Sequence, residues 1–211
     1  DRRGQDGEYD VPVLLASRVF SIDGWALSWS ESDLGRLRSV VTGICAGGIR
    51  ERVIVDHQGE SLWSDVRSGG KATFKDAGVR HGLHRARFLL QFVAPDPRKY
   101  GAENTYPSGF VRHYGNFPAI PVVEVTGAMG AGYAIHGPEG RRFVVTQPLL
   151  SGQTHRIDMR TGRLYRDGVL QIGAVSNGGT WTIPPAKAVP MTLVPVVGGG
   201  VMTVKVLDTF I

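Results

Sequence analysis

The sequence predicts a mostly β protein, in which an α+β domain with an antiparallel sheet and one helix is followed by a β-sandwich. Three observations lead to this prediction. Short runs of β-branched and aliphatic residues alternate with turn residues, and Gly and Pro are frequent, at 29 and 12 of 211 residues. Residues 34–44 have the apolar spacing of a helix. A proline-interrupted segment separates the two halves.

The first predicted domain covers residues 1–95. After a polar, glycine-containing lead-in, residues 11–15 and 18–22 form one strand or two, because they are rich in β-branched and aliphatic residues. The Asp-Gly pair at 23–24 is a turn signal. Residues 25–29 then alternate between large apolar and small side chains, which predicts a further strand.

Three large side chains of that strand, Trp25, Leu27 and Trp29, share one face. At this period-two spacing, the two tryptophans are expected in the core of the domain and not at a cofactor.

One helix and four more strands complete the first domain. Ser30 or Ser32 can cap the helix by accepting a backbone N–H bond at its first turn, and a Gly-Gly pair at 47–48 ends it. The apolar face of the helix consists of Leu34, Leu37, Val41 and Ile44. The strands lie at 52–56, 61–67, 71–74 and 84–93. We expect the helix to cover one face of the resulting antiparallel sheet.

A hinge or linker is predicted at residues 96–111, because the preceding strand runs into an Ala-Pro-Asp-Pro sequence. Two prolines remove two ladder donors and bias the residues before them to extended geometry, so a central strand cannot continue here. The residues that set this hinge are Pro95, Asp96, Pro97, Arg98 and Tyr100.

The second predicted domain, residues 112–211, is almost wholly strand-like. Its predicted strands lie at 121–127, 130–135, 142–146, 154–159, 163–166, 169–172, 180–183, 191–197 and 201–207. Strands at a spacing of roughly 8–12 residues, separated by Gly and Asp-Gly turns, are typical of a β-sandwich.

Composition argues against several partners. The net charge of +5 comes from arginines spread through both halves, whereas nucleic-acid binding usually shows a basic stripe with interleaved aromatic residues. No apolar run reaches the roughly 18 residues that span a bilayer, and no signal-peptide pattern is visible. We therefore expect neither a nucleic-acid nor a membrane partner. Because the chain begins at Asp1, we expect that some N-terminal sequence is missing or removed.

No residue set predicts catalysis or a metal. The single cysteine, Cys45, excludes an internal disulfide and a cysteine-cluster metal site. His81 and His84 are three residues apart in a segment that enters a strand, which is not a metal-ligand spacing, and no carboxylate lies near them. No serine has the flanking glycines of a nucleophile turn. Asp158 and Asp167 fall beside turns, where they are expected to bond the turn backbone. The chain is predicted to be neither an enzyme nor a cofactor protein.

Three aromatic residues of the second domain, Tyr133, Tyr165 and Trp181, are candidates for a glycan-stacking face. The alternative, in which Trp181 fills the core of the sandwich near a strand end, is the stronger interpretation. Arg2 and Arg3 form a solvated end in the simplest interpretation, but next to Gly4 they can also reach a neighbouring subunit.

Several short motifs, in this order, resemble those of the siphovirus distal tail protein family, which includes minor tail proteins with a galectin-like C-terminal domain. They are the lead-in at 4–9 before Arg18, the hinge sequence at 94–100, Gly-Asn-Phe-Pro-Ala-Ile-Pro at 115–121, Ile-Asp-Met-Arg-Thr-Gly at 157–162 and Trp-Thr-Ile-Pro-Pro at 181–185. The chain departs from the family at 185–186, where Pro-Ala replaces the usual Pro-Gly. The likeness covers nearly the whole chain.

This resemblance implies a virion protein at the distal end of the phage tail, part of the baseplate of a siphovirus. Its first domain would be a belt that forms a homo-hexameric ring, and its second a galectin-like sandwich. The ring would join the tail tube protein to the tail-tip hub protein, with the tape measure protein as a further partner. Arg2, Arg3, Trp25 and Trp29 are then candidates for the subunit interface.

Two other functions remain open at the level of sequence. A carbohydrate-binding module would use the sandwich to recognise glycans of the host cell wall, through an exposed row of aromatic side chains. A glycan hydrolase would need a pair of carboxylates, whose positions no sequence motif fixes.

Overall fold

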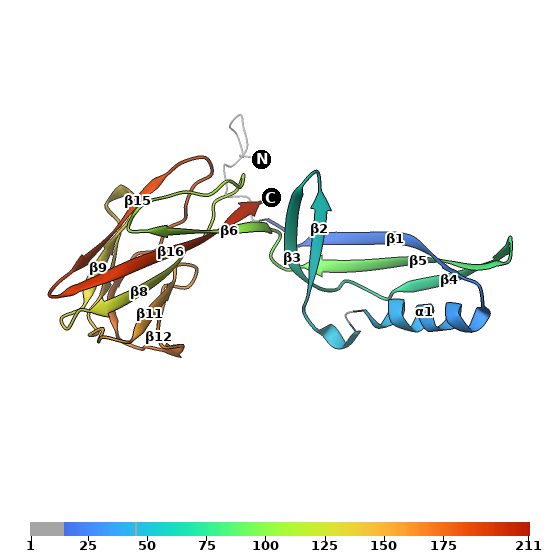
Figure 1. Ribbon diagram of the computed structural model, residues 1–211, viewed down its shortest axis with the longest axis horizontal. Coiled ribbons are helices and arrows are strands. Elements are labelled where there is room, and N and C mark those ends of the chain that lie inside the picture. The colour runs from blue at the N-terminus through green and yellow to red at the C-terminus, as the bar shows by residue number, and fades with distance from the viewer. Residues whose placement is uncertain (1–14, 45) are drawn as a thin grey trace, which may run out of the picture. The chain divides into compact units, whose positions relative to one another are not determined.

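The computed structural model describes residues 15–44 and 46–211 (Figure 1). It is mostly β, with antiparallel sheets and, within the described residues, one α-helix, which confirms the predicted fold class. The chain divides into two compact units. The first contains the described residues up to Ile54 together with Ser64–Pro97, and the second contains Val55–Trp63 and Arg98–Ile211.

The first unit is built on three strands: β1 (Arg18–Ser28), β4 (Thr73–Arg80) and β5 (Leu83–Ala94). β5 is central, because β1 pairs with it along its whole length and β4 pairs with its other side. A second hairpin, β2 (Glu51–His57) and β3 (Glu60–Ser68), continues from this sheet, since the end of β3 also pairs with β5. The Gln58-Gly59 turn that closes the hairpin has positive φ at both residues, as the two-residue turn requires.

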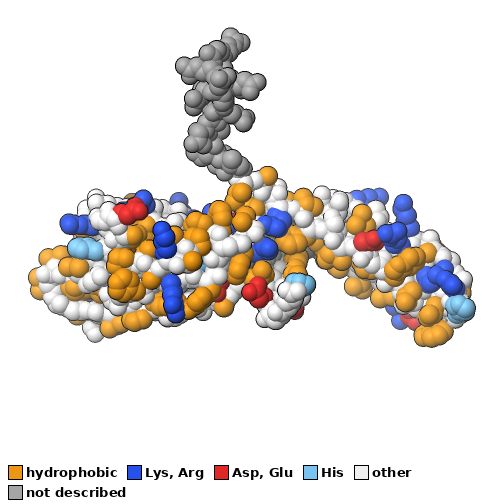
Figure 2. Space-filling view, turned by 90° about the horizontal axis from the view of Figure 1, so that it is seen from above, with side chains coloured by type: hydrophobic (Ala, Val, Ile, Leu, Met, Phe, Trp, Pro, Cys, Tyr) orange, Lys and Arg blue, Asp and Glu red, His pale blue; other side chains and the backbone are white. Residues whose placement is uncertain are grey.

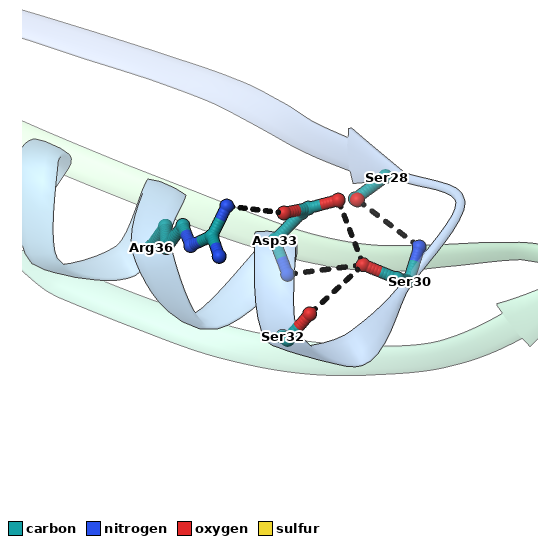
Figure 3. A network of polar contacts seen from close by, with 5 residues as sticks. All are labelled: Ser28, Ser30, Ser32, Asp33 and Arg36. Carbon is teal, nitrogen blue, oxygen red and sulfur yellow. Dashed lines mark hydrogen bonds and ion pairs between the residues drawn. The ribbon is translucent and has the colours of Figure 1, made fainter.

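Helix α1 (Glu31–Gly43) begins after the first of the two serines that the sequence offered as caps. Ser30 is the N-cap, and its hydroxyl accepts the Asp33 backbone N–H at 3.1 Å (Figure 3). The same hydroxyl donates to the Asp33 carboxylate, whose other oxygen accepts from Arg36. The helix ends at Gly43, and a short 3-10 helix, η1 (Ala46–Gly48), follows it.

The helix covers one face of the β1–β5–β4 sheet. Leu34, its one buried residue, packs with Ala26 of β1 and Ala86 of β5. A neighbouring cluster, Val66, Leu90, Phe92 and Ala94, extends this core toward β3. Both clusters are small, so the first unit buries only part of its apolar side chains.

Two sequence predictions for β1 are wrong. The strand runs through the Asp-Gly pair at 23–24 without a turn. Gly24 is needed there for close packing, because a Cβ at this position would lie 2.6 Å from the ring of Phe88 on β5. Trp25 and Trp29 are not in the core. They are 55% and 77% exposed, because α1 covers the opposite face of the strand, where Ala26 lies.

The second unit is a β-sandwich of two sheets. One sheet has the order β6 (Lys99–Pro107), β16 (Gly199–Phe210), β8 (Val122–Ala128), β11 (Thr154–Asp158), β12 (Arg163–Arg166) and β13 (Val169–Leu170). The other has the order β14 (Val175–Gly178), β10 (Arg142–Val145), β9 (Tyr133–His136), β15 (Val189–Pro195) and β7 (Gly109–Val111). A single-turn 3-10 helix, η2 (Pro138–Gly140), connects β9 to β10.

The inward residues of both sheets form one core. Its largest fully buried side chains include Tyr133, Ile135, Phe143, Ile157 and Met191. Val123, Val204 and Val206 fill the spaces between them. This core is much larger than those of the first unit, so most of the chain's apolar burial lies in the sandwich.

Two further predictions are wrong in the second unit. Residues 99–107 and 109–111, expected in the linker, form β6 and β7, so that between β5 and β6 the break in regular structure is limited to residues 95–98. The strand expected at 180–183 is absent, and Ile183 makes only a single bridge, to Ala119. The edge strand is β14 instead, which was missed because Asn-Gly at 177–178 signals a turn.

Candidate interaction surfaces

Two of the motifs in the second unit are bonded to each other. Ala119 and Ile183 exchange backbone hydrogen bonds of 2.9 and 2.8 Å, which joins the segment 115–121 to the segment 181–185. His113 Nε2 donates to the Ile183 carbonyl at 3.1 Å, while its Nδ1 accepts the Gly115 N–H at 3.0 Å. The ring is therefore a neutral imidazole with its hydrogen on Nε2, and burial lowers the pKa of His113.

Gly115 lies against the end of the last strand. A Cβ at this position would be 1.9 Å from the backbone oxygen of Thr209 on β16, so only glycine fits. The Phe117 N–H donates to that same oxygen at 3.0 Å, and the Asn116 side chain accepts from the Ile211 N–H at 2.9 Å. The Gly-Asn-Phe sequence thus fastens the C-terminal strand of the sandwich.

The motif at 157–162 is the hairpin between β11 and β12. Asp158 caps its turn by accepting from the Arg160 N–H at 2.8 Å and from the Thr161 hydroxyl at 3.2 Å. The Met159 N–H donates to the Pro121 carbonyl, which connects this hairpin to the segment 115–121. Asp158 therefore bonds the turn backbone, as its position beside a turn indicated.

The predicted hinge residues have different surroundings. In the first unit, Arg18 Nε donates to the Pro97 carbonyl at 2.9 Å, which ties the start of β1 to the segment after β5. In the second unit, the Arg98 guanidinium lies 5.6 Å from the centre of the Phe117 ring. Pro95 is exposed and Asp96 half-buried.

Tyr100 does not belong to a hinge, because it lies within β6. Its ring packs on Trp63, with 4.8 Å between ring centres. Its hydroxyl accepts from Arg160 Nη2 at 3.0 Å. Together, these contacts hold segments within each unit in place. The motif residues therefore have a structural role.

The first unit presents a sheet face that none of its described elements covers, and this is the surface best suited to a partner. We call it the outer face: the side of β1 and β5 opposite α1. Directly opposed residues of paired strands point to the same side, so the register places Trp25 and Leu27 of β1 with Arg87 and Arg85 of β5. Trp25 and Leu27 are both more than half exposed. Leu89 of β5 lies on the same face and is 37% exposed. Figure 2 looks onto this side, where hydrophobic and basic side chains lie next to one another.

Two arginines of β5 contact residues of β1 on the outer face. The Arg87 guanidinium donates to both oxygens of Asp23, with an Nε–Oδ1 distance of 3.1 Å. This hydrogen bond holds the pKa of Asp23 below its usual value. The Arg85 guanidinium lies 5.9 Å from the ring of Trp25. Exposed Trp beside Arg is the composition of interface hot spots. Sequence reasoning found Trp25 but missed both arginines, because only the strand register brings them beside it.

β1 is also an edge strand. It pairs with β5 on one side, and no strand among residues 15–44 and 46–211 pairs with its other side. An edge of eleven residues exposes unpaired backbone groups, which natural proteins usually cover.

Two of the three candidate glycan-stacking residues are inside the sandwich. Tyr133 is fully buried and Trp181 is 3% exposed, so neither ring offers a face to a sugar. Trp181 fills the core, as the stronger interpretation held, and packs closely over Gly137. Tyr165 is half-buried beside Arg156. These residues therefore do not form the exposed aromatic row that the carbohydrate-binding alternative requires.

Arg2 and Arg3 lie outside the described residues. His155 is buried with Tyr133, whose hydroxyl lies 3.1 Å from its Nδ1, and burial lowers the pKa of His155. Among the described residues, no three His, Cys, Asp or Glu side chains cluster to hold a metal ion, and no helix has the length and hydrophobicity to cross a membrane.

Comparisons with known proteins identify the fold. No protein-family model and no curated protein sequence matches the chain. Among solved structures, the crystal structure of the Dit protein of phage SPP1, described as a paradigm of the hub adsorption apparatus in phages that infect Gram-positive bacteria, matches with a TM-score of 0.78 at 18% identity. The match covers 100% of this chain and 86% of that one. The phage P2 baseplate in its activated conformation with Ca matches at a TM-score of 0.48 and 7% identity, over 88% of this chain and 78% of that one, which is too weak to support a conclusion. The chain thus has, along its whole length, the fold of the SPP1 Dit protein.

Proposed function

We propose that the chain is a structural protein of a phage virion, a distal tail protein at the tip of the tail. The observation that carries this proposal is the fold match to SPP1 Dit over the whole chain, at 18% identity. The order of the motifs supports the proposal independently, because it was read from the sequence alone. The motif residues also form hydrogen bonds that hold segments in place within each unit.

In this role, six copies would form a ring through the first unit. The ring would join the tail tube to the tail-tip hub, with the tape measure protein as a further partner. The outer face and the free edge of β1 support a subunit contact here, because both are exposed in a single chain and carry large apolar side chains beside arginines. A closed ring needs such a heterologous contact between unlike surfaces.

The role needs no catalysis and no cofactor. The hydrogen bonds of His113, Gly115 and Asp158 all lie within the sandwich itself, and those of His113 and Gly115 are buried. The second unit, with its large single core, would project from the ring as a rigid module.

Native mass tests the ring. We expect mass photometry and light scattering on the purified chain to show a hexamer, or a mass that rises toward one with protein concentration. Replacing both Trp25 and Trp29 by alanine should shift this equilibrium toward the monomer, because a buried interface tryptophan typically contributes at least about 2 kcal/mol, roughly thirtyfold per contact. Phe110→Ala is the matched control, since Phe110 is an equally exposed aromatic residue of the second unit.

A chain that stays monomeric at every concentration would contradict the ring. If the double tryptophan variant still formed the hexamer at the same concentrations, the ring would be supported, but the outer face would be refuted as its subunit contact.

A further inference from the structure

A groove in the first unit lies between the C-terminal half of α1 and β4, on the side of the sheet that the helix covers. Its volume is ≈ 660 Å³. Arg38 and Thr42 of the helix line one side of it, and Phe74 of β4 lines the other. Leu90 and Phe92 of β5, which belong to the core, form its floor. Grooves of this volume, with an apolar lining and a few polar groups, are typical ligand sites.

Three basic side chains, Arg38, Lys71 and Lys75, surround the groove, and its described lining contains no acidic residue. All three are exposed, and within the described residues none of them has an ion pair. Lys75 lies directly opposite Arg87 of β5, but the acidic neighbour there, Asp23, is already paired with Arg87. The described part of the chain thus leaves the positive charge at the groove without a counterion.

This lining selects a ligand that is both acidic and apolar. Its carboxylates would form charge-assisted hydrogen bonds with the lysines and the arginine at the rim. A large apolar side chain between them would cover Phe74, which is half-buried, and Ile44, which is 43% exposed and also lines the groove. A peptide segment with Asp or Glu next to Leu or Phe has this composition.

The edge of β4 adds backbone groups to the site. β4 pairs with β5, and no described strand pairs with its other side. Backbone N–H and C=O groups of residues 73–75 that face away from β5 are therefore open to a peptide. The contact must be short, because β2 already pairs with β3 beyond the connection at residues 69–72. The groove thus fits a short segment and not a long added strand.

A peptide matches the groove better than an anionic membrane or a second copy does. The floor is recessed, since Leu90 and Phe92 are only 6% and 4% exposed, and a bilayer surface does not enter a groove to reach them. The chain carries a net charge of +5, so its copies repel one another overall. Both observations favour a segment of a different, acidic protein.

We propose that this groove binds a short acidic and partly apolar segment of a partner protein. The carboxylates of the segment pair with Arg38, Lys71 and Lys75, and its apolar side chain covers Phe74. The groove lies on the helix side of the sheet, opposite the outer face. The contact therefore goes beyond the proposed ring and does not depend on it.

A synthetic peptide array, probed with the labelled full chain, tests the proposal at concentrations where light scattering shows monomers. The eight-residue peptides carry Asp, Lys, Ser, Leu or Phe at each of four central positions. We expect the bound peptides to combine Asp with Leu or Phe and to lack Lys. Combining Lys71→Glu with Lys75→Glu should weaken the tightest of them about tenfold in fluorescence anisotropy. This variant should instead select peptides that contain Lys, because opposite charges then face each other.

Two further variants separate the groove from the overall charge of the chain. Thr42→Trp places a large side chain in the groove from an exposed helix position, and it should abolish binding without a change in charge. Arg163→Glu with Lys187→Glu changes the net charge as much as the two lysine substitutions do, at exposed positions of the second unit, and should leave binding unchanged. Melting temperatures equal to that of the unsubstituted chain show that each variant is folded.

Three results would overturn the proposal. An array that selects no acidic peptides, or selects the same ones after both lysine substitutions, would show that the groove does not recognise them. Flotation with vesicles of phosphatidylcholine and phosphatidylglycerol that depends on the two lysines, without peptide selection, would assign the groove to a membrane. Acidic peptides that lower the native mass of the chain at higher concentration would assign it to a second copy. The ring itself is tested separately, by the substitutions of Trp25 and Trp29.

Discussion

Replacement of Gly115 by alanine should destabilise the sandwich strongly. The added Cβ would stand 1.9 Å from the Thr209 oxygen and 2.5 Å from the Thr209 nitrogen, so the backbone on one side must move. Overpacking of this kind costs about 1–3 kcal/mol. The movement also strains the Gly115 N–H bond to His113 and the Phe117 N–H bond to Thr209, each worth about 1 kcal/mol. We expect a total loss of about 3–5 kcal/mol in the free energy of unfolding.

Calorimetry of the full chain measures this loss. A loss of about 3 kcal/mol should lower the melting temperature of the second unit by roughly 10 °C or more, because a domain of about 100 residues shifts by several degrees per kcal/mol. Gly130→Ala is the control, since Gly130 is exposed, has no positive φ, and a Cβ there would meet no atom within 4 Å. The transition of the first unit should not move in either variant.

Gly115→Ala with a melting temperature equal to that of Gly130→Ala would refute the reasoning. It would mean that the segment 115–121 can shift without loss, so that the Gly-Asn-Phe motif does not fasten the C-terminal strand.

Two other predictions concern local contacts. Ser30→Ala should cost about 1 kcal/mol in the first unit by removing the cap of α1, measured by urea unfolding, whereas Ser32→Ala should cost less; equal effects would contradict the assigned cap. Burial lowers the pKa values of His113 and His155, so below about pH 6.5 the unfolded chain binds more protons than the folded one, and stability that is complete above this pH is lost as pH falls. The urea midpoint of the sandwich should therefore drop between pH 7.5 and 5, and a constant midpoint would show that these rings are not buried as neutral groups.

The sequence predicted most strands of both units because their signals are local. Turns such as Asp167-Gly168 and Gln58-Gly59 need positive φ, and the residue types that tolerate it mark them. Ser30 and Ser32 were predicted as alternative caps on the same grounds. Each of these features depends on a few neighbouring residues, so the chain alone contains the information.

The errors arose where the cause was a distant residue. The Asp-Gly pair at 23–24 has the composition of a turn. The glycine is required instead because it leaves room for the ring of Phe88, which is 64 residues away in the sequence. Residues 99–111 have no clear periodicity, and they become strands because β16 and β15 pair with them from the other end of the chain. No local pattern distinguishes these cases from an ordinary turn or linker.

The outer face shows the same limit at the level of function. Alternation in residues 25–29 correctly placed Trp25 and Leu27 on one side of a strand, but it could not decide which side the single helix covers. That choice is made by Leu34 packing on Ala26 and Ala86, two small residues that leave room for a helix. Because the helix covers the side of Ala26, Trp25 and Leu27 on the other side of the strand are left exposed. The open face thus carries the exposed side chains of Trp25 and Leu27, and a sheet face with this composition is most stable when another surface covers it.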